Sequence, residues 1–369
     1  MQSSSFDVLV IGAGIAGATA AAHLAPTLRV GLIEAEEVAG YHSTGRSAAI
    51  WIQNYGPPDV QALSGLSRRF FEHPPDGFAA TPIMARRPVA FLAPSEQEPL
   101  LERMLAEGAG LREIAVQDLR QMVPALREGY ATRAAIEDDA FDMDVAVLHQ
   151  GFLKLLRHHS GTLALRSRTG RVERVAGRWE VDIVEGGHFS APILVDAAGA
   201  WGDAVALQAG VRPLGLQPKR RTGAIIDPQP WDARDWPLLN DCDHNWYCRP
   251  EARTRLMVSP ADETDVEPQD VQPDELDIAI GIDRMRQALA IDVRRVEHSW
   301  AGLRTFTPDR SLAFGWDARS EGFFWFVGQG GYGIQTSPAA GRLAADLILG
   351  RDPGDAAAIL PVLDPRRFA

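Results

Sequence analysis

The chain opens on a run of apolar residues that do not alternate with polar ones. Phe6 to Ile11 (FDVLVI) is aliphatic and β-branched, which is typical of a strand buried on both faces of a parallel sheet. Ala16 to Ala25 is rich in alanine and predicts a helix that ends before Pro26. Arg29 to Ile33 predicts a second buried strand, with Glu34 at its end. This order predicts a strand–helix–strand unit at the start of the chain.

The turn between the first strand and the helix has the spacing GxGxxG. Gly12 allows a tight turn, Gly14 allows a pyrophosphate to approach the backbone, and Gly17 allows the helix to pack closely on the strand. Glu34 lies 22 positions after Gly12, where a carboxylate accepts both ribose hydroxyls of an adenosine. Together these features predict a dinucleotide site, which could take either FAD or NAD.

Two later segments favour FAD. Gly40 to Ala49 (GYHSTGRSAA) is a polar loop of small residues, found where a nicotinamide-binding domain would continue its sheet. Such a loop can run its backbone along a long cofactor. Ile193 to Trp201 (ILVDAAGAW) predicts another buried strand that ends on small residues. No second GxGxxG of the strand–turn–helix type follows, so we expect a single dinucleotide.

The last apolar segment also suits a flavin. Gly322 to Val327 (GFFWFV) predicts a strand that leads into residues 328–335 (GQGGYGIQ). Ser337 and Pro338 suit the N-cap and first turn of a helix that reaches about Leu349. The N-terminus of such a helix stabilises negative charge, which a reduced flavin carries.

Composition narrows the class of protein. The 369 residues include 37 Lys and Arg against 49 Asp and Glu, a net charge of −12, so we expect no nucleic-acid partner. Two cysteines, Cys242 and Cys248, are too few for a disulfide framework or a cysteine zinc site and suit the cytoplasm. The adjacent His158 and His159 face different ways on a predicted helix, so we expect no metal. Residues 8–25 lack the preceding positive charge of a signal peptide and the apolar bulk of a membrane span, and no transmembrane segment is expected.

The glycine fingerprint, residues 43–49 (STGRSAA), residues 300–309 (WAGLRTFTPD) and residues 328–335 resemble the D-amino-acid-oxidase-type flavoproteins. That family includes glycine oxidase, sarcosine oxidase and the D-amino acid dehydrogenases. Within it, residues 40–49, 210–221 and 270–279 resemble the bacterial D-arginine dehydrogenases. The resemblance implies noncovalently bound FAD and oxidative deamination of D-amino acids.

The resemblance also implies an α/β fold. We expect an FAD-binding Rossmann-like domain of the glutathione-reductase type and a second α+β substrate domain built on an antiparallel or mixed sheet. The expected division is residues 1–80, 142–211 and 305–369 for the FAD domain and residues 81–141 and 212–304 for the substrate domain. Within the substrate domain we expect strands over residues 81–94, 220–226 and 294–303 and helices over residues 100–109 and 273–289.

The family resemblance assigns a large set of residues to the cofactor. They are Gly12, Gly14, Ile15, Ala16, Gly17, Glu34, Ala35, His42, Ser43, Thr44, Arg46, Ser47, Ala48, Val172, Ala198, Gly199, Trp201, Gly302, Gly330, Gly331, Tyr332, Gly333, Ile334, Gln335 and Thr336.

The chemistry of amino-acid oxidation points to an arginine. A hydride moves from Cα to flavin N5, which requires Cα to be held about 3–3.5 Å from the ring. A planar guanidinium matches the two oxygens of the substrate carboxylate. Arg221 and Arg304 both lie in predicted strands beside apolar residues. By resemblance Arg304 and Tyr247 hold the carboxylate, Tyr55 assists, and the Gly331 carbonyl accepts from the amine. Each arginine could instead be a surface charge and each tyrosine a core aromatic. No general base is evident, and solvent can take the amine proton.

Departures from the D-arginine dehydrogenases bear on the substrate. Ile50 stands where those enzymes carry a pocket histidine, and Val89 stands where they carry the glutamate that pairs with the guanidinium. Burying a cation beside valine without a counter-ion would cost several kcal/mol. Ile50, Trp51 and Val89 therefore predict a pocket for uncharged, apolar or aromatic D-amino acids, unless another acid in the loop compensates.

Two other functions stay open. An oxidase of the same fold could use O2 on N-methyl, imino or 2-hydroxy acids, although a 2-hydroxy acid would need a base for its hydroxyl proton. A flavoprotein subunit of a larger electron-transfer complex would carry FAD without acting alone. The electron acceptor, a quinone or another molecule, does not follow from the residues.

Overall fold

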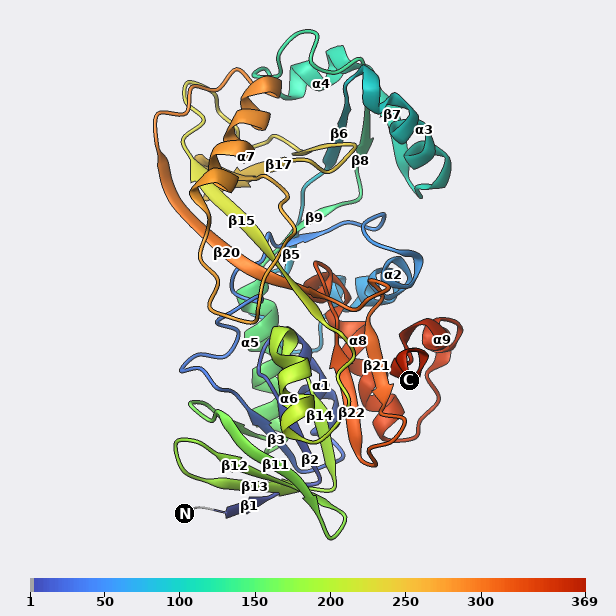
Figure 1. Ribbon diagram of the computed structural model, residues 1–369. Coiled ribbons are helices and arrows are strands. Elements are labelled where there is room, and N and C mark those ends of the chain that lie inside the picture. The colour runs from blue at the N-terminus through green and yellow to red at the C-terminus, as the bar shows by residue number, and fades with distance from the viewer. Residues whose placement is uncertain (1–2) are drawn as a thin grey trace.

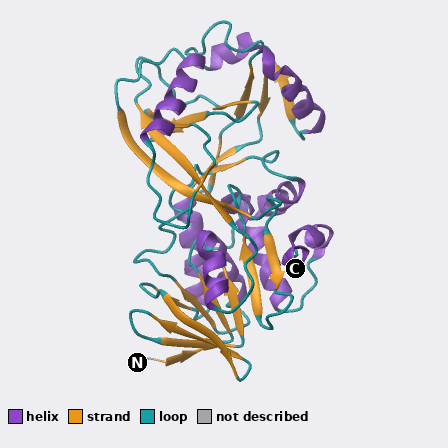
Figure 2. Cartoon of the chain, viewed as in Figure 1, coloured by secondary structure: helices purple, strands orange, loops and turns teal. Residues whose placement is uncertain are grey.

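The computed structural model describes residues 3–369, and its two large sheets lie one above the other (Figure 1; Figure 2). A six-stranded sheet lies in the lower half of Figure 1 and a nine-stranded sheet in the upper half. The six-stranded sheet consists, in order, of β10 (Thr162–Ala164), β3 (Val30–Ile33), β2 (Val8–Ile11), β14 (Ile193–Asp196), β22 (Phe323–Val327) and β21 (Ala313–Trp316). All its pairs are parallel except β21 with β22.

Each face of the six-stranded sheet is covered. Helices α1 (Ile15–Leu24), α5 (Val145–His158) and α8 (Gly333–Ile348) pack on one face with Val8 and Val10. On the other face, Leu9 and Ile11 pack against a four-stranded sheet. Its order is β1 (Ser3–Ser5), β13 (His188–Ala191), β12 (Arg178–Ile183) and β11 (Thr169–Val175). Since both faces are buried, the strands are continuously apolar, as their sequences predict.

Close packing of α1 on α8 depends on small residues. A Cβ atom on Gly341 of α8 would lie 2.2 Å from the Thr19 hydroxyl oxygen of α1. Helix α8 begins at Gly333, four residues before the predicted start, and contains Pro338. The proline lacks an N–H for the Ile334 carbonyl, and the Ser337 hydroxyl donates to that carbonyl instead (2.9 Å). The predicted N-cap at Ser337 was therefore wrong.

The nine-stranded sheet corresponds to the antiparallel or mixed sheet that the sequence predicts. Its strands are β19 (Thr264–Asp265), β15 (Gln217–Ile226), β18 (Arg255–Ser259), β17 (Tyr247–Glu251), β16 (Leu238–Asp241), β6 (Val89–Ala93), β8 (Arg133–Glu137) and β7 (Leu111–Ile114), with β20 (Val296–Phe306) paired to β15. The pairing of β16 with β6 is parallel and the other pairs are antiparallel, so the sheet is mixed, as predicted.

The remaining elements surround these sheets. A small sheet contains β4 (Ile50–Trp51), β9 (Phe141–Met143) and β5 (Met84–Arg86). The other α-helices are α2 (Pro58–Glu72), α3 (Glu98–Glu107), α4 (Val116–Met122), α6 (Gly202–Gln208), α7 (Glu275–Ala288) and α9 (Leu360–Leu363). The single strand expected over residues 81–94 is two strands, because β5 pairs with β9 while β6 joins the large sheet. Long strands β15 and β20 run from the upper sheet down to the lower half (Figure 1).

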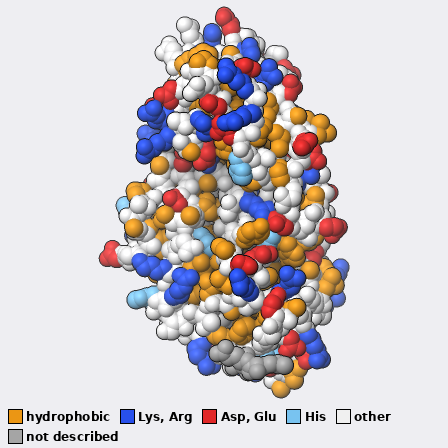
Figure 3. All heavy atoms as spheres, turned by 90° about the vertical axis from the view of Figure 1, so that its left-hand side faces the viewer, with side chains coloured by type: hydrophobic (Ala, Val, Ile, Leu, Met, Phe, Trp, Pro, Cys, Tyr) orange, Lys and Arg blue, Asp and Glu red, His pale blue; other side chains and the backbone are white. Residues whose placement is uncertain are grey.

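Charges of both signs mix on the surface. On the side of the molecule shown in Figure 3, Lys and Arg side chains lie among Asp and Glu over the described residues. Among residues 3–369, none of the helices is both long enough and apolar enough to cross a bilayer.

His23 on α1 is half-buried, and its Nε2 atom is buried without a hydrogen-bond partner among residues 3–369. Its burial, with a smaller effect of the Arg342 charge, lowers the pKa of His23 to about 4 from an ordinary 6.5. As the pH drops, the unfolded chain therefore binds a proton at His23 before the folded protein does. The free energy of unfolding decreases between about pH 6.5 and pH 4.

We expect His23→Leu to remove this loss. Chemical denaturation of the holoprotein at pH 7 and pH 5 should show the wild type losing about 2 kcal/mol more than the variant. His158→Leu, at an exposed position on α5, is the control and should follow the wild type. Equal acid losses in the wild type and His23→Leu would contradict the assignment.

Candidate active site

A cavity of about 580 Å³ lies where the six-stranded sheet meets β15 and β20. Its wall comes from the start of the chain (Ile11 to Ala16), the middle (Ala197 to Trp201) and the end (Gln329 to Ile334). These segments directly follow β2, β14 and β22, which are parallel neighbours. The cavity therefore opens at the carboxyl ends of the strands, where ligands of open α/β sheets bind.

The structure gives a steric reason for two glycines of the first turn, Gly12 and Gly17. Gly12 has a φ of +97°, and a Cβ atom there would lie 2.6 Å from the Ala197 carbonyl oxygen. A Cβ atom on Gly17 would lie 1.8 Å from the Gly12 carbonyl oxygen, so only glycine lets α1 approach the turn. Gly14 lines the cavity, where the backbone is open to a ligand.

Glu34 is fixed at the cavity edge by backbone donors. Its Oε2 accepts from the Ala13 N–H (2.8 Å) and its Oε1 from the Glu36 N–H (3.0 Å). The side chain lines the cavity, and each carboxylate oxygen has a further lone pair. This arrangement suits a vicinal diol such as the ribose of an adenosine.

A buried histidine that the sequence did not single out also supports this turn. His149 of α5 lies 2.9 Å from the Ala13 carbonyl oxygen through Nε2. Burial lowers the pKa of His149, which favours the neutral ring that donates this hydrogen bond. Since Ala13 lies between Gly12 and Gly14, α5 holds the turn from behind.

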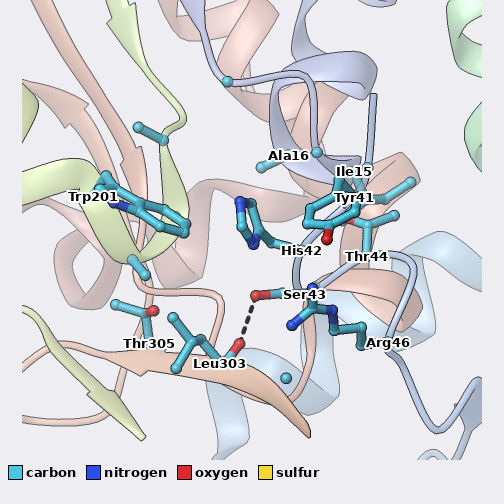
Figure 4. A pocket seen from close by; sticks show the side chains of 18 of the residues that line it. Ile15, Ala16, Tyr41, His42, Ser43, Thr44, Arg46, Trp201, Leu303 and Thr305 are labelled. Atoms are coloured by element: carbon cyan, nitrogen blue, oxygen red, sulfur yellow. Dashed lines mark hydrogen bonds between the residues drawn. The ribbon is translucent and has the colours of Figure 1, made fainter. Parts of the chain in front are cut away.

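The polar loop of residues 40–49 ties the first segment to β20. Ser43 Oγ donates to the Leu303 carbonyl (2.6 Å; Figure 4). The guanidinium of Arg46 donates to the Ala301 carbonyl (3.1 Å). The His42 ring lies 4.5 Å from the Trp201 ring, and its Nε2 lies 3.0 Å from Glu36 Oε1. His42 therefore braces the cavity wall.

Most of the predicted cofactor residues line this cavity. The exceptions are Gly17, Val172, Tyr332, Gln335 and Thr336. Val172 does not line the cavity: its side chain is buried between the two lower sheets, and Ser167 to Thr169 line the cavity instead. Gln335 and Thr336 face the protein: the Gln335 amide donates to Ser64 Oγ (2.8 Å) and the Thr336 hydroxyl to the Tyr332 carbonyl (2.9 Å).

The donors and the space suit FAD. Gly12 and Gly14 leave room for a pyrophosphate at the start of α1, and Glu34 offers acceptors to the adenosine. The other end of the cavity reaches Gly330 and Gly331, before α8. Tyr41, Gln269, Asp270 and Trp300 also line it. Three of them lie in segments that carry the family resemblance, residues 40–49, 270–279 and 300–309, but none was predicted as a site residue.

Arg304 lies at this far end of the cavity. Its Nη1 donates to the Tyr55 hydroxyl (2.9 Å), and a Cβ atom on Gly331 would lie 2.8 Å from the same nitrogen. Among residues 3–369 no carboxylate lies within salt-bridge distance of this guanidinium. A buried cation without a counter-ion is costly, so the site favours an anion here.

Tyr247 lines the cavity near two arginines. Burial alone would raise the pKa of the Tyr247 hydroxyl, but the charges of Arg304 and Arg221 outweigh it and lower the pKa. Burial and the neighbouring Tyr55 raise the pKa of Tyr332 to about 12, so its hydroxyl stays protonated.

Arg221 differs from Arg304 in already having partners. It donates to the Asp262 carbonyl (2.8 Å) and to Glu263 (3.2 Å), and Glu263 also accepts from Arg310 (2.9 Å). Arg221 lines the cavity, but Glu263 offsets its charge. The sequence assigned Arg221 and Arg304 to the same site, but in the structure Arg221 already has an acidic partner.

None of the three residues predicted for the substrate pocket, Ile50, Trp51 and Val89, lines this cavity. Val89 is 0% exposed in an apolar cluster that Ile50, Tyr55 and Tyr247 contact. Trp51 is 1% exposed on the opposite side of β4, where its indole N–H donates to the Ser64 carbonyl (3.3 Å). Because neighbouring strand residues face opposite ways, Ile50 and Trp51 cannot both face the pocket, and Trp51 belongs to the core.

No metal ligand set is present among residues 3–369. His158 and His159 lie at the end of α5, and Cys242 and Cys248 are buried and unpaired. None of these four residues lines the cavity.

We expect Glu34→Ala to weaken FAD binding, because the Ala13 N–H and the ribose hydroxyls lose an anionic acceptor. Loss of one charge-assisted hydrogen bond corresponds to a rise in Kd of about 10- to 100-fold. Dialysis followed by absorbance of the retained flavin measures this, with the exposed Glu37→Ala as control. Unchanged FAD retention in Glu34→Ala would contradict the assigned contact.

Comparison with known proteins agrees with this geometry. Residues 7–347 match the family described as DAO, FAD dependent oxidoreductase. FAD-dependent oxidoreductase domain-containing protein 1 of Xenopus laevis is 28% identical over 172 residues, which cover 42% of this chain and 34% of that protein. The match thus spans about a third of that relative's length.

Solved structures share the fold over nearly the whole chain. Glycine oxidase from Geobacillus kaustophilus has a TM-score of 0.82 at 20% identity, covering 95% of this chain and 96% of that one. L-proline dehydrogenase from P. horikoshii has a TM-score of 0.84 at 19% identity, covering 100% and 98%. L-amino acid deaminase from Proteus vulgaris has a TM-score of 0.79 at 17% identity, covering 99% and 96%. The glycine turn, the fixed Glu34 and the family match together show that this chain belongs to the DAO family of FAD-dependent oxidoreductases.

Proposed function

We propose that this chain oxidises free amino acids with uncharged side chains, and that D-amino acids are its substrates. The products are an imino acid, which water hydrolyses to a 2-oxo acid and ammonia, and reducing equivalents for a quinone or another acceptor. The observation that carries the proposal is the Arg304 guanidinium, buried beside Tyr55 at the end of the cavity without a carboxylate partner among residues 3–369.

Arg304 and Tyr55 provide a site for the substrate carboxylate. The planar guanidinium can donate two parallel hydrogen bonds to the two carboxylate oxygens. Its contact with Tyr55 fixes the orientation of the fork before substrate arrives, because Nη1 is already bonded to the hydroxyl (2.9 Å). A substrate carboxylate also supplies the missing counter-ion, so binding offsets the cost of burying Arg304.

Gly331 leaves space for the rest of the substrate. A side chain there would collide with Arg304 Nη1, as the 2.8 Å distance to a Cβ atom shows. Gly331 lines the cavity, and we propose that its backbone carbonyl accepts from the amine. The amine must lose its extra proton to solvent before oxidation, because an ammonium has no lone pair to stabilise the imine. Bound FAD supplies the oxidant, accepting a hydride at N5.

Similar proteins support an amino-acid substrate. The names of the solved structures identify a glycine oxidase, an L-proline dehydrogenase and an L-amino acid deaminase. The preference for D-amino acids rests on the resemblance of residues 40–49, 210–221 and 270–279 to the D-arginine dehydrogenases. We further propose that FAD is bound noncovalently, since Cys242 and Cys248 lie outside the cavity wall. We also propose that the chain divides into an FAD domain and a substrate domain at the boundaries expected from the sequence.

Anaerobic mixing of the yellow protein with D- and L-amino acids tests the proposal. We expect apolar D-amino acids to bleach the flavin band at about 450 nm. Arg304→Lys should lower kcat/KM about a hundredfold, because an ammonium cannot bind both oxygens in parallel. Arg310→Lys, an exposed arginine paired with Glu263, is the control. A wild type that no amino acid bleaches would overturn the proposal and favour a hydroxy-acid enzyme or an electron-transfer subunit.

We propose that the apolar residues around Tyr55 and Tyr247 discriminate against basic substrates. Val89 is buried among apolar side chains and offers no counter-ion, and the carboxylate of nearby Glu137 is directed at its donors, Gln53 and Asn54. We expect kcat/KM for D-Arg and D-Lys to be at least about tenfold below that for D-Leu or D-Phe, because a buried cation would lack a counter-ion. Steady-state kinetics with a dye acceptor measures the ratio, and a preference for D-Arg would refute the expectation.

A further inference from the structure

Glu137 is a buried carboxylate that the proposed chemistry does not use. It ends β8, is 1% exposed, and faces Val89 across the β6–β8 pair. Facing residues of paired strands share one face of the sheet, so Glu137 lies on the face that carries the Val89 cluster. Tyr55 and Tyr247 pack against that cluster. Among residues 3–369 no cation pairs with this carboxylate; its hydrogen bonds come from neutral donors.

Both donors belong to the segment that carries Tyr55. Glu137 Oε1 accepts from the Gln53 N–H (3.0 Å), and Oε2 accepts from the Asn54 side-chain amide (2.8 Å). The Asn54 side chain also exchanges two hydrogen bonds with the backbone of Ala109, each 2.9 Å long. Residues 53 and 54 are thus fastened to the upper sheet immediately before Tyr55.

Residues of helices α8 and α2 also hold the segment around Tyr55. The Gln335 side chain contacts the Ile52 N–H and the Tyr55 carbonyl (3.4 Å each), and the Gln61 amide donates to the Gly56 carbonyl (2.9 Å). The 3.4 Å contacts are longer than ordinary hydrogen bonds, while the contacts to Glu137 are not. Arg304, the partner of Tyr55, lies in β20 of the same sheet as Glu137. Glu137 therefore connects Tyr55 to the sheet that positions Arg304.

We propose that Glu137 is a positioning residue that holds residues 53–54 on the upper sheet and so keeps the Tyr55 hydroxyl against Arg304. Any effect of Glu137 on substrate binding rests on the proposed function, whereas its effect on residues 53–54 does not. The carboxylate matters because both of its oxygens accept, whereas an amide offers only one acceptor.

A pair of substitutions tests the contact without removing side-chain volume. Glu137→Gln places an amide donor against the Asn54 amide donor, and Asn54→Asp places two carboxylates together. The double variant Glu137→Gln/Asn54→Asp restores a donor–acceptor pair between the two positions, although the new carboxylate at position 54 can no longer donate to the Ala109 carbonyl. Glu113→Gln, on the neighbouring strand β7 and paired with surface Arg133, is the matched control.

Hydrogen exchange of the FAD-loaded proteins is the first measurement. We expect amides of residues 52–56 to exchange about tenfold faster in each single variant, as the loss of one buried hydrogen bond implies. The double variant should recover most of the protection, and Glu113→Gln should match the wild type. Unchanged exchange in Glu137→Gln would overturn the proposal, whether or not any amino acid reduces the flavin.

Kinetics on the same variants separates positioning from general stability. We expect Glu137→Gln to raise KM about tenfold with kcat per bound FAD within about twofold, and the double variant to return KM towards the wild type. A purely structural role would lower the melting temperature or the FAD content and leave KM unchanged. That result, like a double variant no better than Glu137→Gln, would refute a positioning role. If the wild type oxidises no amino acid, the proposed function fails and the exchange result still decides whether Glu137 holds the segment.

Discussion

Hydrogen bonds between the loop at residues 40–49 and β20 are the constraint on which the site depends. Ser43 and Arg46 donate to the carbonyls of Leu303 and Ala301, on either side of Gly302. A Cβ atom on Gly302 would lie 3.2 Å from Arg46 Cβ, so the strand lies close against the loop. This contact places the strand that carries Arg304 beside the glycine-rich part of the cavity. A second link, the hydrogen bond from the Gly330 N–H to the Thr305 carbonyl (2.9 Å), joins β20 to the turn after β22.

Local signals in the sequence predicted the cofactor half well. Gly17 and Glu34 act through neighbours within one strand–helix–strand unit, so their spacing carries the information. The substrate half depends on partners far along the chain. Arg221 and Arg304 look alike in sequence, and only Glu263, 42 positions from Arg221, distinguishes them. Trp51 was misplaced because the face of β4 that meets the core depends on α2 and β9. Glu137 gave no signal, because its partners lie more than 80 positions away.

The acidic segment between residues 262 and 277 determines which arginine is free. Asp270 pairs with Arg46, Asp277 with Arg220 and Glu263 with Arg221. Each pair neutralises a cation near the cavity, and Arg304 lies beyond the reach of the segment. The carboxylates of this segment thus pair with arginines near the cavity, which the composition alone does not reveal. By offsetting the neighbouring charges, they concentrate the attraction for an anion at one guanidinium.

The cavity wall draws on residues near the beginning, the middle and the end of the chain, and this has a consequence for synthesis. A ribosome must translate the chain as far as Ile334 before the last part of the wall exists. Strand β22 must also insert between β14 and β21, although β2 and β14 pair from segments made much earlier. Pairing over such sequence separations is slow, and unpaired strand edges are open to wrong partners meanwhile. The full cavity wall therefore forms only after residue 334 is translated, and productive expression should depend on how well the incomplete sheet is protected until then.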